Sequence, residues 1–301
     1  MNPAIGQLAA IATAFFWSAT ALFFSYSGRR IGSQVVNRSR LLFALFFISL
    51  SHLALQGTLF PVDAEPFRWG WLSLSSIIGL VIGDTFLFYA YVLIGPRLSM
   101  LVMSLVPIIN TAAGWLLFAE QISTWEMAGI LLAVAGVAWT VTEPRGQVLP
   151  AEQRQLGRGL LAAAGGALGQ ALNLITARYG LVDGFATISA TQIRLLVAVA
   201  VLWGLALVRG RAGTTLRAWQ DRRAFVALVA GAISGPFLGI WLSLVAVQQA
   251  RLGIASTLMA LPPVILIPVE FVVFRRKVSG RGIAGTLLAF SGVALIFLAP
   301  G

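Results

Sequence analysis

Residues 128–139 read AGILLAVAGVAW and residues 284–295 read AGTLLAFSGVAL, so that eight of the twelve positions are identical. The offset between the two stretches is 284 − 128 = 156 residues. A similar register holds upstream, where residues 40–42 (RLL) correspond to residues 194–196 (RLL), and residues 97–98 (RL) to residues 251–252 (RL). The second half of the chain is therefore a diverged copy of the first. Many secondary transporters are built from such internal repeats.

The composition is that of a membrane protein. Of the 301 residues, 58% are hydrophobic and 10% are charged, and the mean hydropathy is +0.90. Soluble domains carry roughly 25% charged residues. A chain with so few charges cannot cover a water-facing surface, so we expect the lipid bilayer to be its solvent and its main partner.

The charge and the lack of cysteine exclude several functions. A net charge of +11 would suggest a nucleic-acid partner in a soluble protein. Here the charges lie in short loops between apolar spans, so they indicate how the chain is oriented in the membrane. We therefore expect no nucleic-acid partner. The absence of cysteine excludes disulfides, thiolate metal sites and thiol catalysis. We expect no cofactor and no metal.

Ten segments are long enough to cross a membrane, because a span needs roughly 20 apolar residues. These segments predict an all-α integral membrane fold with ten transmembrane helices: 5–26, 35–55, 69–92, 97–118, 124–142, 156–178, 185–208, 222–247, 251–274 and 280–299. They form a first repeat in residues 1–143, a linker in residues 144–155 and a second repeat in residues 156–301. Because five is an odd number, the repeats must cross the membrane in opposite senses, as an inverted repeat.

The basic residues predict which way the chain lies in the membrane. The side of the membrane that holds the N-terminus is called side A, and the other is called side B. Side B holds sixteen of the 21 basic residues, and side A holds three, namely Arg68, Arg178 and Arg251. Because basic residues are retained on the cytoplasmic side, we expect a multi-pass protein of the cell membrane with side B in the cytoplasm and both termini outside.

Repeated motifs give the chain a family resemblance. A tryptophan, Trp17, lies inside the first span, and an arginine lies early in the second span of each half, Arg40 and Arg194. A proline is central in each fourth span, Pro107 and Pro263. The turn FAEQIS at 118–123 precedes a fifth span with Gly129 and Gly136, which are matched in the second half by Gly285 and Gly292. In these features the chain resembles the EamA-like ten-helix members of the drug/metabolite transporter superfamily. The resemblance implies export or exchange of small metabolites, often amino acids or related amphiphiles.

The chain departs from the family pattern in two respects. The glutamate of the turn is present as Glu120 but is replaced by Arg276 in the second half. Many members are thought to have cytoplasmic termini, whereas the charge distribution here predicts external ones. The direction of transport is therefore open.

Asp84 is the most informative single residue. It lies inside the third span, where an aspartate costs roughly 2.5–3.5 kcal/mol on insertion scales. Arg40 is the expected partner, because the depths of the two residues from side B differ by only about 5 Å. Two roles remain open for Asp84: a site for a substrate ammonium group or a proton, or a structural ion pair.

Arg194 lies near the middle of its own span. The candidate intramembrane acid of the second half, Glu270, lies close to the side-B end of its span, so Arg194 lacks an evident full counter-ion. One interpretation is that its guanidinium binds a substrate carboxylate. The other is that Gln170, Asn173 or backbone carbonyls satisfy it.

Prolines interrupt both fourth spans at corresponding places. They are Pro107 in the first half and the pair Pro262 and Pro263 in the second. A proline inside a helix removes a backbone hydrogen bond, and paired interruptions point to the binding site and to pivots in transporters. We therefore expect hinges there, with Asn110 using the polar groups that Pro107 frees.

Aromatic residues away from the membrane interface are candidate walls of a substrate site. Trp17, Tyr89 and Trp241 are the ones that we assign to it, although packing is the commoner role of such residues. Trp17, with Ser18 and Thr20 beside it, is the best candidate among them for a ligand contact.

Three function classes compete. A secondary transporter of a small metabolite, working by alternating access, accounts for the inverted repeat, the paired prolines and the few intramembrane charges. A flippase of a lipid-linked intermediate would share the fold. An intramembrane lipid-modifying enzyme needs convergent acids, histidines or metal ligands, and the chain has one histidine. Substrate gradients or a proton gradient could drive transport, with Asp84 as the proton carrier, in a monomer or a homodimer.

Overall fold

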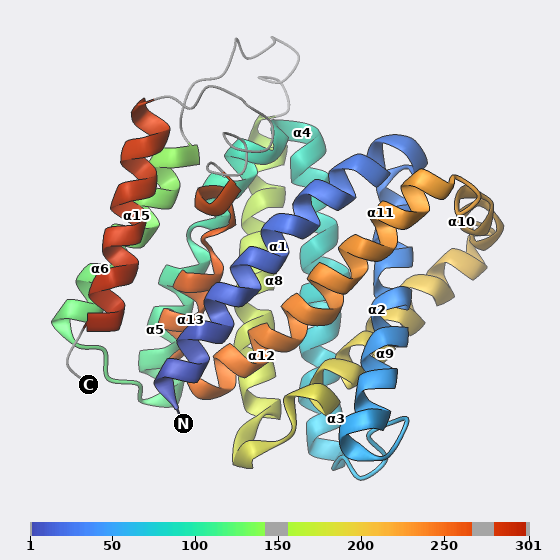
Figure 1. The fold of residues 1–301 in the computed structure, drawn as a ribbon, viewed down its shortest axis with the longest axis horizontal. Helices are drawn as coiled ribbons and strands as arrows, with labels where there is room; N and C mark the ends of the chain where they lie inside the picture. Colours follow the sequence, from blue (N-terminus) through green and yellow to red (C-terminus); the bar gives the residue numbers. More distant parts are fainter. Residues whose placement is uncertain (1, 142–155, 267–279, 299–301) are drawn as a thin grey trace.

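The computed structural model describes residues 2–141, 156–266 and 280–298. The linker 144–155, Glu270 and the basic run 275–277 lie outside the described residues. Every element in the described part is helical (Figure 1). The elements are α1 (Pro3–Ile31), α2 (Ser33–Gln56), α3 (Pro66–Ser76), η1 (Ile77–Gly83), α4 (Asp84–Met103), α5 (Val106–Phe118), α6 (Thr124–Val141), α8 (Leu156–Gly180), η2 (Val182–Gly184), α9 (Thr187–Val208), α10 (Ala212–Ala218), α11 (Arg222–Ala232), η3 (Ile233–Gly239), α12 (Ile240–Gln249), α13 (Leu252–Met259) and α15 (Gly280–Leu298).

Local sequence accounts for several helix ends. Asn2 caps α1, because its side chain accepts a hydrogen bond from the Ile5 N–H. Asp221 caps α11 in the same way through the Ala224 N–H. Gly57 ends α2 with a φ of 73°, a left-handed conformation that favours glycine.

Eight described helices are long and apolar enough to cross a membrane, and two shorter apolar helices, Thr124–Trp139 and Leu252–Leu266, lie where the sequence predicts the fifth and ninth spans. The count of ten spans stays a prediction. The third and fourth spans expected at 69–92 and 97–118 correspond to the candidate spans Pro66–Ala90 and Ser99–Phe118, although the helix α4 continues through the boundary to Met103. Hydropathy reports where a chain leaves the bilayer and not where its backbone stops being helical.

The fifth helices of the two repeats, α6 and α15, pack against each other (Figure 1). A Cβ atom on Gly136 would lie 2.4 Å from the Ala289 nitrogen, and one on Gly129 would lie 2.8 Å from the Gly292 oxygen. As the residue number along α6 increases, the residue number of its contact partner on α15 decreases, so the two helices are antiparallel. Small residues at these positions let the two backbones approach closely.

The second helices, α2 and α9, are also paired antiparallel. His52 Nε2 lies 2.9 Å from Ser189 Oγ, and the Trp203 indole donates to the Arg38 carbonyl at 3.2 Å. His52 is buried between the two helices. Equivalent helices that run antiparallel are the arrangement expected of an inverted repeat.

The first helix of each repeat packs on the third helical segment of the other repeat. Helix α1 lies against α11, η3 and α12, and α8 lies against α3, η1 and α4. Close contacts are made through glycines: a Cβ atom on Gly6 would lie 2.6 Å from the Ala250 nitrogen, and one on Gly159 would lie 2.1 Å from Ile94. The two repeats are therefore interleaved.

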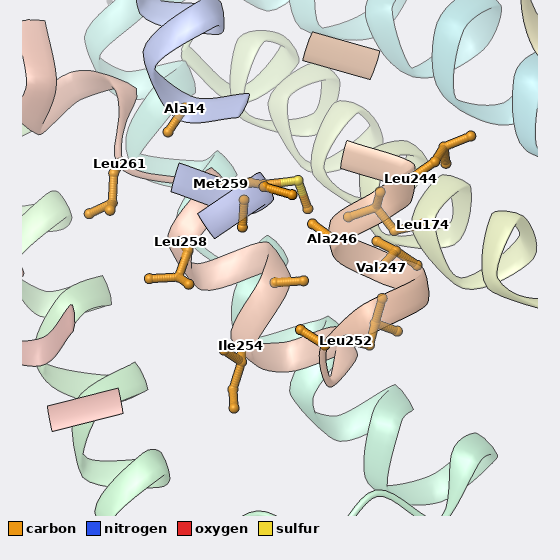
Figure 2. Packing of buried hydrophobic residues seen from close by; sticks show 14 of the residues in the cluster. Ala14, Leu174, Leu244, Ala246, Val247, Leu252, Ile254, Leu258, Met259 and Leu261 are labelled. Carbon is orange, nitrogen blue, oxygen red and sulfur yellow. The ribbon is translucent and has the colours of Figure 1, made fainter. Parts of the chain in front are cut away.

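The largest buried apolar cluster lies where the two repeats meet. It includes Ala14 of α1, Leu174 of α8, Leu244 of α12 and Leu258 of α13 (Figure 2). Residues of α6 and α15 belong to the same cluster. The core is thus shared between the halves.

Each third segment contains a π-helical stretch at the same place in the repeat. These stretches are η1 and η3, and their first residues are 233 − 77 = 156 positions apart. Short π-helical turns inside α-helices occur often at functional sites. The stretch η1 ends directly before Asp84, the first residue of α4.

Each fourth span is broken at the same place. Ser104 donates its N–H to the Met100 and Leu101 carbonyls at 3.1 and 3.2 Å, and Ala260 donates to the Ser256 and Thr257 carbonyls at the same two distances. The offset is again 260 − 104 = 156 residues. The backbone resumes a helix after each break, at Val106 and at Pro262.

Candidate functional site

The first component of the candidate site is a buried ion pair between Arg40 on α2 and Asp84 on α4. Arg40 Nη2 bonds to Asp84 Oδ2, and the two side chains are 11% and 10% exposed. Arg40 Nε also donates to Asn37 Oδ1 at 2.9 Å. Asp84 Oδ1 accepts a further hydrogen bond from Gln170 Nε2 at 3.0 Å, so the pair reaches into the second repeat.

Asn173 on α8 extends this network. Its Nδ2 donates to Gln170 Oε1 at 3.3 Å, and its Oδ1 accepts from Ser75 Oγ at 2.8 Å and from Arg194 Nη2. A Cβ atom on Gly79, inside η1, would lie 2.4 Å from the Asn173 side chain. Glycine in η1 is therefore what allows Asn173 to sit against the third segment.

Arg194 is the most deeply buried charged group of the network. It is 1% exposed and is among the largest fully buried side chains of the described residues. Asn173 accepts from Nη2, whereas Nε and Nη1 have no hydrogen-bond partner in the described part of the chain. Asp84 is the carboxylate whose charge acts on this guanidinium. Of the groups named in the second interpretation of Arg194, Asn173 bonds to it, and this bond satisfies only one of the three nitrogens.

The network carries an excess of positive charge. Within the described residues it holds two guanidinium groups, Arg40 and Arg194, and one carboxylate, Asp84. Leaving a buried donor unsatisfied costs about 1–3 kcal/mol. An anion bound beside Arg194 would both accept hydrogen bonds and balance the charge.

Asn110 on α5 lies apart from this network. Its side chain is fully buried, and neither of its polar atoms has a hydrogen-bond partner among the described residues. The expectation that it uses polar groups freed by Pro107 is therefore wrong for the described residues.

The three aromatic candidates have different surroundings. Trp17 packs against η3, where a Cβ atom on Gly239 would lie 2.6 Å from its indole nitrogen. Trp241 donates to Thr187 Oγ1 at 3.1 Å and stacks on Phe237, so its polar atom is already used.

Tyr89 does not belong to the polar network. Its side chain is 52% exposed. It follows Asp84 by five residues on α4, which turns it roughly 140° around the helix from that carboxylate. The assignment of Tyr89 to the substrate site stays a prediction, and it would place Tyr89 apart from the polar network.

The prolines lie at the start of the second piece of each broken span. Pro107 is in the first turn of α5 and is buried, and Pro262 begins the short helix at 262–266. A proline in a first helical turn costs no hydrogen bond. Ser18 on α1 has its hydroxyl 3.5 Å from the Pro262 carbonyl, so the second break adjoins the first helix.

Glu120 has a structural role in the turn between α5 and α6. It is 8% exposed, and its Oε2 accepts from the Leu252 N–H at 2.8 Å, at the N-terminus of α13. Its Oε1 lies 3.2 Å from Arg178 Nη2, outside hydrogen-bonding geometry. Burial raises the pKa of the Glu120 carboxyl, while Leu252 and Arg178 act to lower it. The turn FAEQIS thus fastens one repeat to the fourth span of the other.

Comparisons with known proteins agree with this architecture. A solved structure titled "Crystal structure of protein" is similar over 99% of this chain and 98% of its own, with a TM-score of 0.78 and 20% sequence identity, which speaks for the fold alone. The search of curated proteins gives no match. The model of the EamA-like transporter family matches residues 4–142 and again residues 157–298. Because these two matches cover nearly the whole chain, the protein belongs to the EamA-like transporter family.

Proposed function

We propose that the protein moves a small carboxylate-bearing metabolite, such as an amino acid or a similar amphiphile, by export or exchange across the cell membrane. Membership in a transporter family supports transport in general. The substrate class rests on one observation, the buried Arg194 guanidinium with two nitrogens that lack an acceptor in the described residues. A carboxylate would supply acceptors and the missing negative charge.

The substrate would bind between the two repeats. Arg40, Asp84 and Ser75 come from the first repeat, and Asn173 and Arg194 come from the second. A group bound to residues of both repeats stabilises the state in which those residues converge. Relative movement of the repeats would then couple binding to release on the opposite side, which is alternating access.

The two breaks and the two π-helical stretches would be the pivots of this movement. They occur in pairs at an offset of 156 residues in the third and fourth helical segments. Irregular backbone in paired segments is the usual mark of the mobile, ligand-binding part of an inverted-repeat transporter. Pro107 and Pro263 prevent each break from closing into a regular helix.

Asp84 would link this site to the energy source. Its carboxylate holds Arg40 and Gln170 together. Protonation of Asp84 would weaken both contacts, and a bound substrate ammonium group would compete for the same oxygens. A proton gradient and a substrate gradient are therefore both compatible with the site.

The experiment starts from uptake of an amino-acid panel by proteoliposomes that contain the purified protein. For the best substrate, the affinities of the acid and of its amide are compared in the wild type and in Arg194→Gln, Arg194→Lys and Arg68→Gln. We expect the acid to bind at least about tenfold more tightly than the amide in the wild type, a difference of about 1.4 kcal/mol. Arg194→Gln should remove most of this preference, and Arg194→Lys should restore part of it, because lysine does not bind two oxygens in parallel.

Arg68→Gln is the matched control. Arg68 is also buried but bonds to the Val182 carbonyl at 2.8 Å, outside the network, so the preference should persist. An unchanged acid-to-amide ratio in Arg194→Gln would show that Arg194 is structural. If no water-soluble metabolite is taken up while a lipid-linked substrate crosses the bilayer, the protein is a flippase.

A further inference from the structure

A second feature of the molecule lies away from the polar network, on the outer face of α2, α9 and α11. These helices enclose an open groove of about 820 Å³. Its walls are almost entirely apolar, and Ser49 is the one residue among them without a large apolar or aromatic side chain. The lining residues are Leu42, Phe43, Leu45, Phe46, Phe47, Ser49, Leu50, Leu59, Phe60, Leu196, Trp219, Phe225 and Val229.

One end of the groove is closed by an aromatic cluster. The ring of Phe43 lies 5.1 Å from that of Trp219 and 5.4 Å, edge to face, from that of Phe225. The Trp219 indole donates to Ser39 Oγ at 2.9 Å. This bond holds the end of α10 against the first turns of α2.

Two arginines, Arg38 and Arg211, lie next to this end of the groove. Arg38 precedes Leu42 by one helical turn, so it lies on the face of α2 that lines the groove. Its Nη2 donates to Thr215 Oγ1 of α10 at 2.8 Å. Arg211 donates to Gln34 Oε1 at 3.2 Å, and the positive charges of Arg38 and Arg211 act on each other.

This pair of like charges has no carboxylate within ion-pair distance among the residues that the structure describes. The Arg38 Nε is buried without a hydrogen-bond partner there. The nearby acid, Asp221, is already engaged: the Ala224 N–H and then the Arg30 guanidinium lower the pKa of its carboxyl. An additional anion would therefore remove a repulsion at Arg38 and satisfy a buried donor.

The surrounding edge of the molecule is positively charged as well. The ends of α1, α2, α9 and α11 meet there with α10, at the upper right of Figure 1. In the described residues this edge carries the arginines Arg29, Arg30, Arg209, Arg217, Arg222 and Arg223 in addition to the pair.

We propose that the groove and the Arg38–Arg211 pair form a binding site for an anionic phospholipid, with the phosphate at the two arginines and an acyl chain along the groove. Basic pockets beside membrane helices recognise acidic lipid head groups. The apolar walls favour a lipid over free phosphate, because an acyl chain can cover them and a phosphate cannot, and Arg38 lies one helical turn from Leu42 in the groove wall. The site is independent of the proposed transport site.

The test compares phosphatidylglycerol with phosphatidylcholine of the same acyl chains, added to the detergent-purified full chain. Bound lipid is counted by native mass spectrometry, and thermal unfolding is followed in parallel, since a ligand that binds the folded state raises the melting temperature. We expect the wild type to bind phosphatidylglycerol at least about tenfold more tightly. The double change Arg38→Gln with Arg211→Gln should abolish this preference, and Arg38→Lys with Arg211→Lys should retain most of it.

The matched control is Arg222→Gln with Arg223→Gln, which removes the same charge from the exposed first turn of α11. It should leave the preference within about twofold of the wild type. An equal loss in the control would overturn the proposal, because the lipid would then respond only to the general charge of this edge.

A last variant, Val229→Trp, fills the groove and leaves both arginines in place. It should weaken phosphatidylglycerol binding. If binding is unchanged in this variant, or if inorganic phosphate stabilises the wild type as much as the lipid does, the groove holds no acyl chain and the proposal fails.

Discussion

At the scale of single residues, the set of polar contacts around Asp84 is the feature that most constrains function. Arg40 bonds to Asp84 directly, and the charge of Arg194 acts on it from the other repeat. The Arg40–Asp84 pair could be predicted from sequence, because two opposite charges at similar depth in a membrane should meet. The approach of Arg194 could not, because it depends on how α8 and α9 pack on α3 and η1.

We predict that the double variant Asp84→Asn with Arg40→Gln folds and keeps its melting temperature within a few degrees, yet transports at no more than about one tenth of the wild-type rate. Removing both charges keeps the charge balance of the network, whereas Asp84→Asn alone should destabilise the protein strongly, since breaking one partner of a buried pair costs about 3–5 kcal/mol. Proteoliposome uptake and thermal unfolding measure the two effects.

The control for this variant is Glu120→Gln with Arg178→Gln, which removes another ion pair between helices and should leave substrate recognition intact. Recovery of transport in the Asp84/Arg40 double variant would mean that Asp84 serves only to neutralise Arg40.

At the scale of helical elements, the structure contains pairs of irregularities that follow the repeat. The broken fourth spans were foreseeable, because Pro107 and Pro263 occupy matching positions. The π-helical stretches were not, because α and π turns with the same apolar residues have the same hydropathy. A usable signal was present in Gly79 and Gly83, which recur as Gly235 and Gly239.

We predict that Pro107→Ala combined with Pro263→Ala lowers the transport rate at least about threefold while the substrate affinity changes less than about twofold. At position 107, alanine restores the N–H that proline lacks, so the first break can close into a continuous helix; at position 263, alanine removes one of the two adjacent prolines that keep the second break open. The rate and the affinity are measured in the same proteoliposome preparation.

Pro66→Ala is the matched control, because Pro66 also stands in a first helical turn, that of α3, but residues 57–65 before it are not helical, so no break between two helices can close there. A wild-type rate in the Pro107/Pro263 double variant would exclude the breaks as pivots.

At the scale of the whole molecule, the distribution of the arginines bears on the orientation in the membrane. The start of α1 and the end of α15 lie at the same edge in Figure 1. The three side-A arginines each bond to a backbone carbonyl, namely Val182 for Arg68, Ala250 for Arg178 and Gln121 for Arg251. On side B, Arg38 and Arg211 have no ion pair in the described residues. Packing thus uses the few arginines of one side, and the free charge collects on the other.

We predict that both termini face away from the cytoplasm, because the free positive charge is retained on the cytoplasmic side. A reporter that fluoresces only in the cytoplasm, fused after Gly301, should give dark cells. The same reporter inserted into the exposed segment between Arg209 and Arg211 should give bright ones. The reverse pattern would contradict this orientation.

The interleaved packing of α1 and α8 has a consequence for how the chain reaches its native state. Because the ribosome makes the chain from its N-terminus, α1 is synthesised long before α11, η3 and α12, the segments that pack against it. Until those segments insert, the small-residue face of α1 around Gly6 has only lipid beside it. The repeat is therefore a unit of sequence and of ancestry, whereas the unit of cooperative assembly is the entire chain.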